Sequence, residues 1–362
     1  MMYYSIVLFV AEITKPGGTE RVVANLANSF QEHGHRVQVV SVNTIGGQSF
    51  YPLSAGVELL HLGVVLEPNV FKRMTSGFRN TVKGIRSILP IETTILMATD
   101  PMTCYALAFI QPRFPQHKYI ASEHMGLAIA KSYSLLARKC LYGRMDAIVT
   151  LTQRDREALV DVGIPHKRIA VIPNQLSFLP DESCDYAAKQ ILTIGKYNPQ
   201  KGYDLLLDYV LPVMPQYPDW KLVLVGQGEW KELLQKRIDV ARLSRQIVLY
   251  PPTRDIQSHY LASSIYLMTS RYEGFPMVLL EARACGLPVL SVDCPSGPAE
   301  ILHEDDGILV SMDDAEAFRG ALQRLMEDEE LRQSLGQNAK KDAQKYDAES
   351  IYSRWLALLE EL

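Results

Sequence analysis

The stretch Ser270-Arg-Tyr-Glu-Gly-Phe-Pro-Met-Val-Leu-Leu-Glu-Ala282 decides how this chain is interpreted. It predicts a turn at Glu273 and Gly274, then a helix with Pro276 at its first position, where a missing N–H does no harm. A helix N-terminus offers free N–H groups and a positive dipole end to a phosphate. Glu273 precedes that helix and Glu281 lies within it, so two carboxylates can receive the hydroxyls of one ligand. The alternative is a plain capped helix with both glutamates solvated.

Outward from this junction, apolar strands alternate with helices in both halves of the chain. The first forty residues show a strand, a glycine-containing loop, a helix capped by Thr19 and a second strand. Further strands are predicted at 94–98, 119–121, 147–151, 190–194, 220–225, 247–250, 265–269 and 288–292. Continuous apolar strands joined through helices predict parallel sheets covered on both faces. The expected fold class is therefore α/β, with two Rossmann-like domains that bind ligands at the carboxyl ends of their strands.

A length of 362 residues suits two domains of ordinary size. The predicted bounds are 1–178 for the first domain, 179–186 for a linker that includes the polar stretch Pro180–Asp185, and 187–345 for the second domain. Residues 346–362 form a terminal amphipathic helix with Ile351 and Trp355 on its apolar face. Periodicity shows only that this helix needs a partner surface.

Composition places the chain among soluble globular proteins, with 47% hydrophobic and 22% charged residues. No segment reaches the eighteen or so apolar residues of a membrane span, and no basic residue precedes the apolar run Ser5–Ala11. The five cysteines lack metal-ligand spacing, which indicates reduced thiols. We expect a cytoplasmic protein with no metal, no other cofactor and no nucleic-acid partner.

The net charge of −4 is unevenly distributed. Residues 1–175 hold 18 Lys and Arg against 12 Asp and Glu, whereas the remainder holds 19 against 29. The basic excess gathers in two clusters, one of Lys72, Arg73, Arg79, Lys83 and Arg86 and one of Lys131, Arg138, Lys139 and Arg144. Such clusters favour peripheral binding to an anionic membrane surface, here the inner face of the cell membrane. Ordinary solvated helix faces are the alternative.

The segment 273–288 resembles the paired-glutamate signature of retaining glycosyltransferases of family 4. The match comprises Glu273-Gly-Phe-Pro, the spacing of seven residues between the two glutamates, and Ala282-Arg-Ala-Cys-Gly-Leu-Pro288. That family has the GT-B fold of two facing Rossmann-like domains, and its terminal helix returns to the first domain. The resemblance spans nearly the whole chain. It implies that Glu281 holds the ribose hydroxyls and that Glu273 contacts the donor sugar. It also implies that the donor phosphate and sugar are held by Gly274, Phe275, Pro276, Met277 and Val278.

Two lysines and two glycines complete the expected donor site. Lys196 and Lys201 lie in one loop, and two cations there suit a diphosphate leaving group. The family often has arginine at the position of Lys196, which puts bidentate phosphate contact by this residue in doubt. Gly17 and Gly18 lack the Gly-x-Gly-x-x-Gly spacing of a dinucleotide site, which argues against an NAD enzyme. The resemblance implies instead that their loop closes over the donor diphosphate.

His124 follows a predicted strand of the first domain in the sequence Ser122-Glu123-His124. A lone histidine is more often structural. The resemblance nevertheless implies that His124 contacts the donor sugar near the reacting carbon. The expected catalytic residues are therefore His124, Glu273 and Lys201.

Together these residues predict a retaining, metal-independent hexosyltransferase. The expected donor is a UDP-linked hexose or N-acetylhexosamine, although Tyr250-Pro-Pro-Thr253 departs from the turn at which the family holds the base. Cys294-Pro-Ser-Gly-Pro298 resembles a version found in enzymes of bacterial O-antigen, capsule and exopolysaccharide assembly. The expected acceptor is therefore a lipid-linked oligosaccharide. Two alternatives remain: a sugar-nucleotide epimerase with the same fold, and a catalytically silent assembly subunit.

Overall fold

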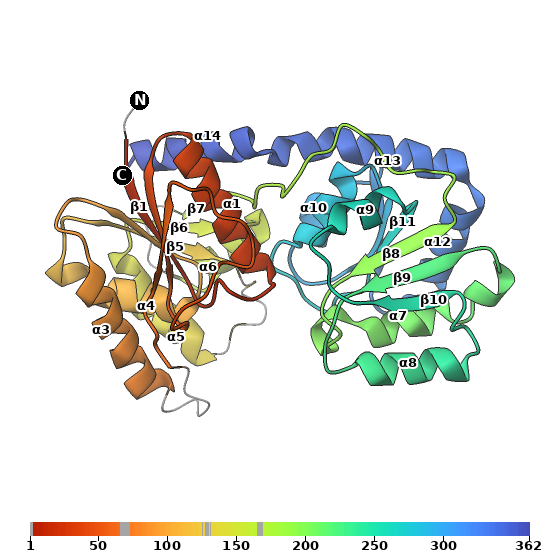
Figure 1. The fold of residues 1–362 in the computed structure, drawn as a ribbon, viewed down its shortest axis with the longest axis horizontal. Helices are drawn as coiled ribbons and strands as arrows, with labels where there is room; N and C mark the ends of the chain where they lie inside the picture. The colour runs from red at the N-terminus through yellow and green to blue at the C-terminus, as the bar shows by residue number, and fades with distance from the viewer. Residues whose placement is uncertain (1–2, 66–72, 125, 127–129, 131, 165–168) are drawn as a thin grey trace. The chain divides into compact units, whose positions relative to one another are not determined.

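The computed structural model describes residues 3–65, 73–124, 126, 130, 132–164 and 169–362 (Figure 1). The chain divides into two compact units, here called unit 1 and unit 2. Unit 1 comprises Met1–Ser177 together with Ala348–Leu362, and unit 2 comprises Phe178–Asp347. Each unit is an α/β layer structure in which helices cover both faces of a parallel sheet (Figure 1).

The described residues of unit 1 form a seven-stranded parallel sheet in the order β3-β2-β1-β4-β5-β6-β7. The strands are β1 Ser5–Val10, β2 Arg36–Ser41, β3 Val57–His61, β4 Ile95–Ala98, β5 Lys118–Glu123, β6 Ala147–Thr150 and β7 Ile169–Val171. The order reverses between β1 and β4, where Ile6 pairs with Ile95. The two edge strands, β3 and β7, were not predicted, because both are only partly buried and lack the continuous apolar pattern of the central strands.

The helices of unit 1 cover this sheet. They are α1 Gly18–Glu32, η1 Arg73–Gly77, α3 Phe78–Ile88, α4 Pro101–Ile110, η2 Gln111–Arg113, α5 Ser132–Leu141, η4 Tyr142–Arg144, α6 Gln153–Asp161 and α14 Ala348–Glu360. The cap of α1 is Gly17 rather than the predicted Thr19. The terminal helix α14 packs on α1, where the Phe30 ring lies 6.2 Å from the Trp355 ring in an edge-on arrangement. The C-terminal helix therefore returns to the first domain.

The described residues of unit 2 form a six-stranded parallel sheet in the order β10-β9-β8-β11-β12-β13. The strands are β8 Gln190–Ile194, β9 Lys221–Val225, β10 Ile247–Tyr250, β11 Ile265–Met268, β12 Val289–Asp293 and β13 Gly307–Ser311. The sequence did not predict the edge strand β13, which is partly exposed. Here the order reverses between β8 and β11.

The helices of unit 2 are η5 Pro199–Lys201, α7 Tyr203–Val210, η6 Met214–Gln216, α8 Lys231–Val240, α9 Ile256–Leu261, α10 Met277–Ala284, α11 Pro298–Ile301, α12 Ala315–Glu327, α13 Glu329–Ala343 and η7 Gln344–Tyr346. Helix α7 ends at Val210, and a separate 3₁₀ turn that contains Pro215 follows. In the part of the chain that the structure describes, no helix is both long and apolar enough to span a membrane.

Candidate active site

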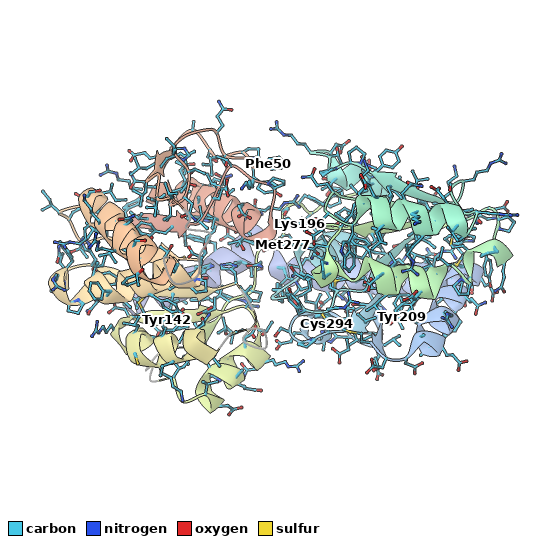
Figure 2. The ribbon with its side chains drawn as sticks, turned by 90° about the horizontal axis from the view of Figure 1, so that it is seen from below. Phe50, Tyr142, Lys196, Tyr209, Met277 and Cys294 are labelled. Carbon is cyan, nitrogen blue, oxygen red and sulfur yellow. The ribbon has the colours of Figure 1, made fainter. Side chains whose placement is uncertain are left out.

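The junction between β11 and α10 is built around Pro276. This residue is the N-cap of α10 rather than its first helical residue, with φ −71° and ψ 105°. Gly297 packs directly against it, since a Cβ on Gly297 would lie 2.6 Å from Pro276 Cδ. Gly297 also has φ +93°, a conformation that glycine adopts without strain. The loop that contains Gly297 thus packs against the start of α10, and a larger residue at position 297 would clash with Pro276. Met277, the first residue of α10, is labelled in Figure 2.

Glu281 lies inside α10 and is 1% exposed. The hydroxyl of Tyr260, on α9, donates a hydrogen bond of 3.0 Å to Glu281 Oε2. A carboxylate accepts hydrogen bonds only and has about four acceptor positions. A buried carboxylate therefore has to be surrounded by hydrogen-bond donors such as this hydroxyl.

Glu273 and Lys201 form an ion pair at the carboxyl ends of β11 and β8. The distance from Lys201 Nζ to Glu273 Oε1 is 2.6 Å, and the two side chains are 20% and 8% exposed. Lys201 is therefore mostly covered by protein, and its ammonium group is engaged by a carboxylate. Gly202 explains the geometry, because a Cβ there would lie 2.0 Å from the carbonyl oxygen of Thr269. The loop after β8 thus passes closely over the loop after β11.

Lys196, in the same loop as Lys201, is exposed (Figure 2). Its neighbour Tyr197 is buried and donates a hydrogen bond of 2.8 Å to the carbonyl of Leu224. Gly228 lies against Tyr197, and a Cβ on it would come within 2.3 Å of the Tyr197 carbonyl oxygen. The backbone that carries Lys196 is therefore fixed, while its ammonium group is left in solvent. The structure brings together Lys201 and Glu273 but records no bond from Lys196 to either.

In unit 1, Gly17 and Gly18 begin α1. Gly17 has an extended backbone with φ −166°, so its conformation does not require glycine. The side chain of Glu20 reaches back over it, and a Cβ on Gly17 would lie 2.0 Å from Glu20 Oε2. Gly18 is exposed and has open space around it. Gly18 therefore leaves part of the start of α1 accessible, whereas Glu20 covers Gly17 and is a polar group there that sequence reasoning did not single out.

His124 directly follows β5 and is partly exposed. Its Nε2 lies 3.1 Å from Ser122 Oγ. Desolvation lowers the pKa of His124 to about 4, although the nearby Glu123 acts in the opposite direction. The imidazole is therefore neutral near pH 7, where it can exchange hydrogen bonds with a hydroxyl but carries no positive charge.

A small cavity of unit 1 opens beside His124. Its lining includes Ser122, Trp355 of α14, and two buried amides, Asn174 and Gln175. Gln175 Oε1 has no hydrogen-bond partner among the described residues. Sequence reasoning missed both amides. Their one signal is the placement of Pro173-Asn174-Gln175 directly after an apolar stretch, where parallel strands of such sheets present ligand groups.

Arg138 was predicted to belong to a membrane-binding cluster, and this prediction is wrong because its side chain is buried. It is 2% exposed and forms a bidentate ion pair with Glu123, with both N–O distances 2.8 Å. Its position within a helix, next to other basic residues, looked like a solvated face. The helix instead turns this side chain towards the carboxylate at the end of β5. Lys139 and Arg144 are exposed.

Three basic residues of the other predicted cluster share one helix. Arg79, Lys83 and Arg86 lie on α3 and are exposed. Lys72 of this cluster and Lys131 of the second one lie outside the described residues, and the side chain of Arg73 is likewise not described.

A group of possible metal ligands, His303, Asp306 and Asp342, is engaged in an ion-pair network of unit 2. Arg283 of α10 lies 2.7 Å from Asp306 and 2.5 Å from Asp342. Burial acts against the charged form of Asp306, but its bonds to Arg283 lower its pKa overall. The network fixes the C-terminal half of α10 against α13.

Comparison with known proteins identifies the family. The sequence profile "Glycosyltransferase Family 4" matches residues 16–175, and "Glycosyl transferases group 1" matches residues 184–342. The amylovoran biosynthesis glycosyltransferase AmsD of Erwinia amylovora is 29% identical over 366 residues, covering 98% of this chain and 99% of that protein.

Two further matches extend over nearly all of the chain. The GalNAc-alpha-(1->4)-GalNAc-alpha-(1->3)-diNAcBac-PP-undecaprenol alpha-1,4-N-acetyl-D-galactosaminyltransferase of Campylobacter jejuni is 24% identical, with 98% of both chains covered. The crystal structure of an S. aureus TarM mutant in complex with Fondaparinux, alpha-GlcNAc-glycerol and UDP has a TM-score of 0.81 at 14% identity, covering 98% of this chain and 99% of that one. The matches of both units, together with the parallel sheets, show that the chain belongs to glycosyltransferase family 4 and has the GT-B fold.

Proposed function

We propose that the chain is a retaining glycosyltransferase that moves a hexose or N-acetylhexosamine from a UDP-sugar to a lipid-linked acceptor in cell-surface polysaccharide assembly. The observation that carries this proposal is the Lys201–Glu273 ion pair directly before the helix that contains Glu281. The names of the relatives support the process, since AmsD belongs to amylovoran biosynthesis and the Campylobacter enzyme carries PP-undecaprenol in its name. The presence of UDP in the TarM complex supports the nucleotide.

In the proposed mechanism, the Glu281 carboxylate accepts hydrogen bonds from the ribose hydroxyls, and the N–H groups at the start of α10 bind the diphosphate. Phe275, Pro276 and Met277 line this helix start, beside Gly274 and Val278. The N-terminal N–H groups of a helix and its dipole both favour an anion. Lys201 and Lys196 add positive charge, and the negative charge that they offset grows as the diphosphate departs.

The reaction breaks the bond between the anomeric carbon and the diphosphate oxygen. The acceptor hydroxyl forms its bond on the same face, and the departing phosphate oxygen takes the hydroxyl proton. No metal ion is needed in this scheme, because the lysines and the helix start stabilise the leaving charge. Glu273 holds Lys201 before the donor binds and then also receives a hydroxyl of the donor sugar. His124, as a neutral imidazole, hydrogen bonds a sugar hydroxyl near the reacting carbon.

The test is acceptor-dependent release of UDP. Purified protein is incubated with UDP-hexoses and UDP-N-acetylhexosamines, with and without a short-chain lipid diphosphate-linked N-acetylhexosamine. We expect release of UDP to rise on adding this acceptor, and NMR of the product to show the anomeric configuration of the donor. An epimerase would change the sugar nucleotide without acceptor, whereas an assembly subunit would bind no UDP in calorimetry. Inverted configuration in the product would contradict the retaining mechanism.

We further propose that the protein is cytoplasmic and associates with the inner face of the cell membrane through α3. Two exposed arginines lie beside aromatic rings. The guanidinium of Arg86, on α3, lies 5.9 Å from the Phe114 ring centroid, and that of Arg113, on η2, lies 5.9 Å from the Phe109 ring centroid. Phe109 is 43% exposed. Basic groups beside exposed rings suit an anionic bilayer surface, where each basic residue contributes about 1 kcal/mol.

A further inference from the structure

The loop that follows β2 is long and carries two neighbouring aromatic rings, Phe50 and Tyr51 (Phe50 is labelled in Figure 2). It runs from the end of β2 at Ser41 to the start of β3 at Val57. Both rings are partly exposed, and Ile45 in the same loop is 89% exposed. Loops of about fifteen residues are uncommon in compact domains and usually functional. This one leaves apolar groups accessible to solvent.

Hydrogen bonds hold the first half of this loop in one conformation. Thr44 Oγ1 lies 2.6 Å from Ser41 Oγ and 2.7 Å from His61 Nδ1. His61 Nε2 lies 2.9 Å from the carbonyl oxygen of Gly47. The chain of contacts from β2 through Thr44 to β3 fixes where the loop leaves the sheet.

The second half is fixed to α1 and to the loop after β1. Asn28 of α1 donates to the Pro52 carbonyl at 3.0 Å and accepts from the Ser54 N–H at 2.8 Å. The Phe50 N–H donates to the Ile13 carbonyl at 3.0 Å. The aromatic pair is therefore preorganised, so little conformational entropy would be lost when a ligand binds there.

The rings lie at the edge of the sheet where ligands bind in this class of fold. Phe50 is bonded to the loop between β1 and α1, and the strand order of unit 1 reverses between β1 and β4. In open α/β sheets, ligands bind outside the carboxyl ends of the strands at this reversal. The Phe50 and Tyr51 rings meet edge to face, with centroids 5.0 Å apart. Arg21 of α1 lies 4.7 Å from the Tyr51 ring centroid.

We propose that Phe50 and Tyr51 form a binding site for a pyranose ring of the acceptor glycan. The C–H groups on one face of a pyranose are apolar and slightly positive, and an aromatic face is slightly negative, so the two attract when stacked. The Arg21 guanidinium, which lies over the Tyr51 ring, supplies a polar group beside the rings. The inference rests on the proposed function, since it assigns the acceptor to this loop.

Saturation-transfer NMR with octyl glycosides of glucose, galactose, mannose and their N-acetylamino forms tests the proposal without relying on catalysis. We expect the wild-type protein to bind one or more of these probes through the ring C–H protons. Phe50→Ala and Tyr51→Ala should weaken the affinity about five- to tenfold, the scale of one aromatic contact. Phe50→Leu should weaken it similarly while keeping apolar volume, and Tyr51→Phe should change it little.

Tyr3→Ala is the matched control, because Tyr3 is a 75% exposed aromatic residue of the same unit that precedes β1 and so lies at the opposite edge of the sheet. It should bind the probes like wild type. Wild-type protein that binds none of the probes, or Phe50 and Tyr51 variants with unchanged affinity, would overturn the proposal. UDP calorimetry separates the two hypotheses: all variants should bind UDP equally, and a wild-type protein that does not bind UDP contradicts the proposed function alone.

Discussion

Two ion pairs, one in each unit, adjoin residues of the candidate active site and differ in their surroundings. Arg138–Glu123 of unit 1 is fully buried, with both guanidinium bonds 2.8 Å long, and Arg138 also donates to Ser134 Oγ at 2.5 Å. Lys201–Glu273 of unit 2 joins two loops, and 20% of the lysine side chain is exposed. The first pair is satisfied by protein groups alone. The second has a cation that can turn to another anion.

This difference assigns the pairs to different tasks. Glu123 directly precedes His124, and Ser134 lies near the start of α5, so Arg138 connects the two ends of the segment that begins with His124. A planar guanidinium with five donors can hold both ends, which an ammonium group cannot. Lys201 is instead a compact point charge next to a helix start, as suits transient contact with a phosphate.

The largest expected effect is on stability. Arg138→Met leaves the Glu123 carboxylate buried without its partner and should destabilise the protein by about 3–5 kcal/mol. Thermal unfolding followed by calorimetry measures this. Arg271→Met is the control, since its pair with Asp204 is about one-third exposed at both side chains and should contribute no more than about 1 kcal/mol. The double variant Glu123→Gln/Arg138→Met should recover much of the loss, and equal destabilisation by both single arginine variants would contradict the distinction.

The second effect is on catalysis. Lys201→Ala should lower kcat/KM by about 10²–10³, because one preorganised contact to the departing diphosphate is lost. Steady-state kinetics with a UDP-sugar and a lipid-linked acceptor measure it. The control Lys189→Ala removes an ammonium group from an exposed pair with Asp219 and should leave kcat/KM nearly unchanged. Activity of the Lys201 variant within about threefold of wild type would rule out the assigned role.

Substitution of the two glutamates should have different effects, one mainly on UDP affinity and the other mainly on kcat. Glu281→Gln keeps the shape and the Tyr260 contact but weakens the charge-assisted bonds to ribose, so UDP affinity should fall about tenfold. Glu273→Gln should instead lower kcat more than UDP affinity, because its partner is the donor sugar. Calorimetric titration with UDP distinguishes the variants. If both bind UDP like the wild-type protein, Glu281 does not hold the ribose.

The His124 side of unit 1 should show a pH dependence. The folded-state pKa of His124, about 4, lies below that of an unfolded histidine, so the neutral form is favoured by folding. The part of the free energy of unfolding that depends on neutral His124 is fully present above about pH 6.5 and is lost as the pH falls towards 4. His124→Asn should therefore lose less stability than wild type between pH 7 and pH 5, by about 1 kcal/mol after allowance for partial exposure. If the free energy of unfolding changes equally with pH in wild type and His124→Asn, the pKa of His124 is not depressed.

A further expected effect concerns the surface charges. Lys83→Glu/Arg86→Glu should weaken binding to anionic vesicles at least tenfold at low salt, because each basic residue contributes about 1 kcal/mol. Added salt should release the wild-type protein, since exposed charges are screened. Lys231→Glu/Lys236→Glu on α8 is the control for net charge, because it reverses two exposed charges outside both clusters and should leave vesicle binding nearly unchanged. Equal partitioning of the wild-type protein onto neutral and anionic vesicles would leave the basic face of α3 solvated, with the acceptor soluble.

The sequence by itself determined the α/β class, the family and most central strands. Those strands are continuous apolar runs, and the Glu273 and Glu281 spacing lies within one local segment, so both are readable without distant contacts. The edge strands β3, β7 and β13 escaped prediction because they are short or partly exposed. Local pattern also placed His124 at the end of a strand, which the structure confirms.

Only the tertiary structure decided which charges meet. Lys201 and Glu273 are 72 residues apart in the chain, and their pairing depends on β8 and β11 being neighbours in the sheet. Arg138 looked like a surface cation because its sequence neighbours are basic, yet the rotation of α5 directs it to Glu123. Helical periodicity indicates that one face is buried, but it does not predict which carboxylate pairs with a charged residue on that face. The partner of a charge depends on strand order and helix packing, which long-range contacts decide.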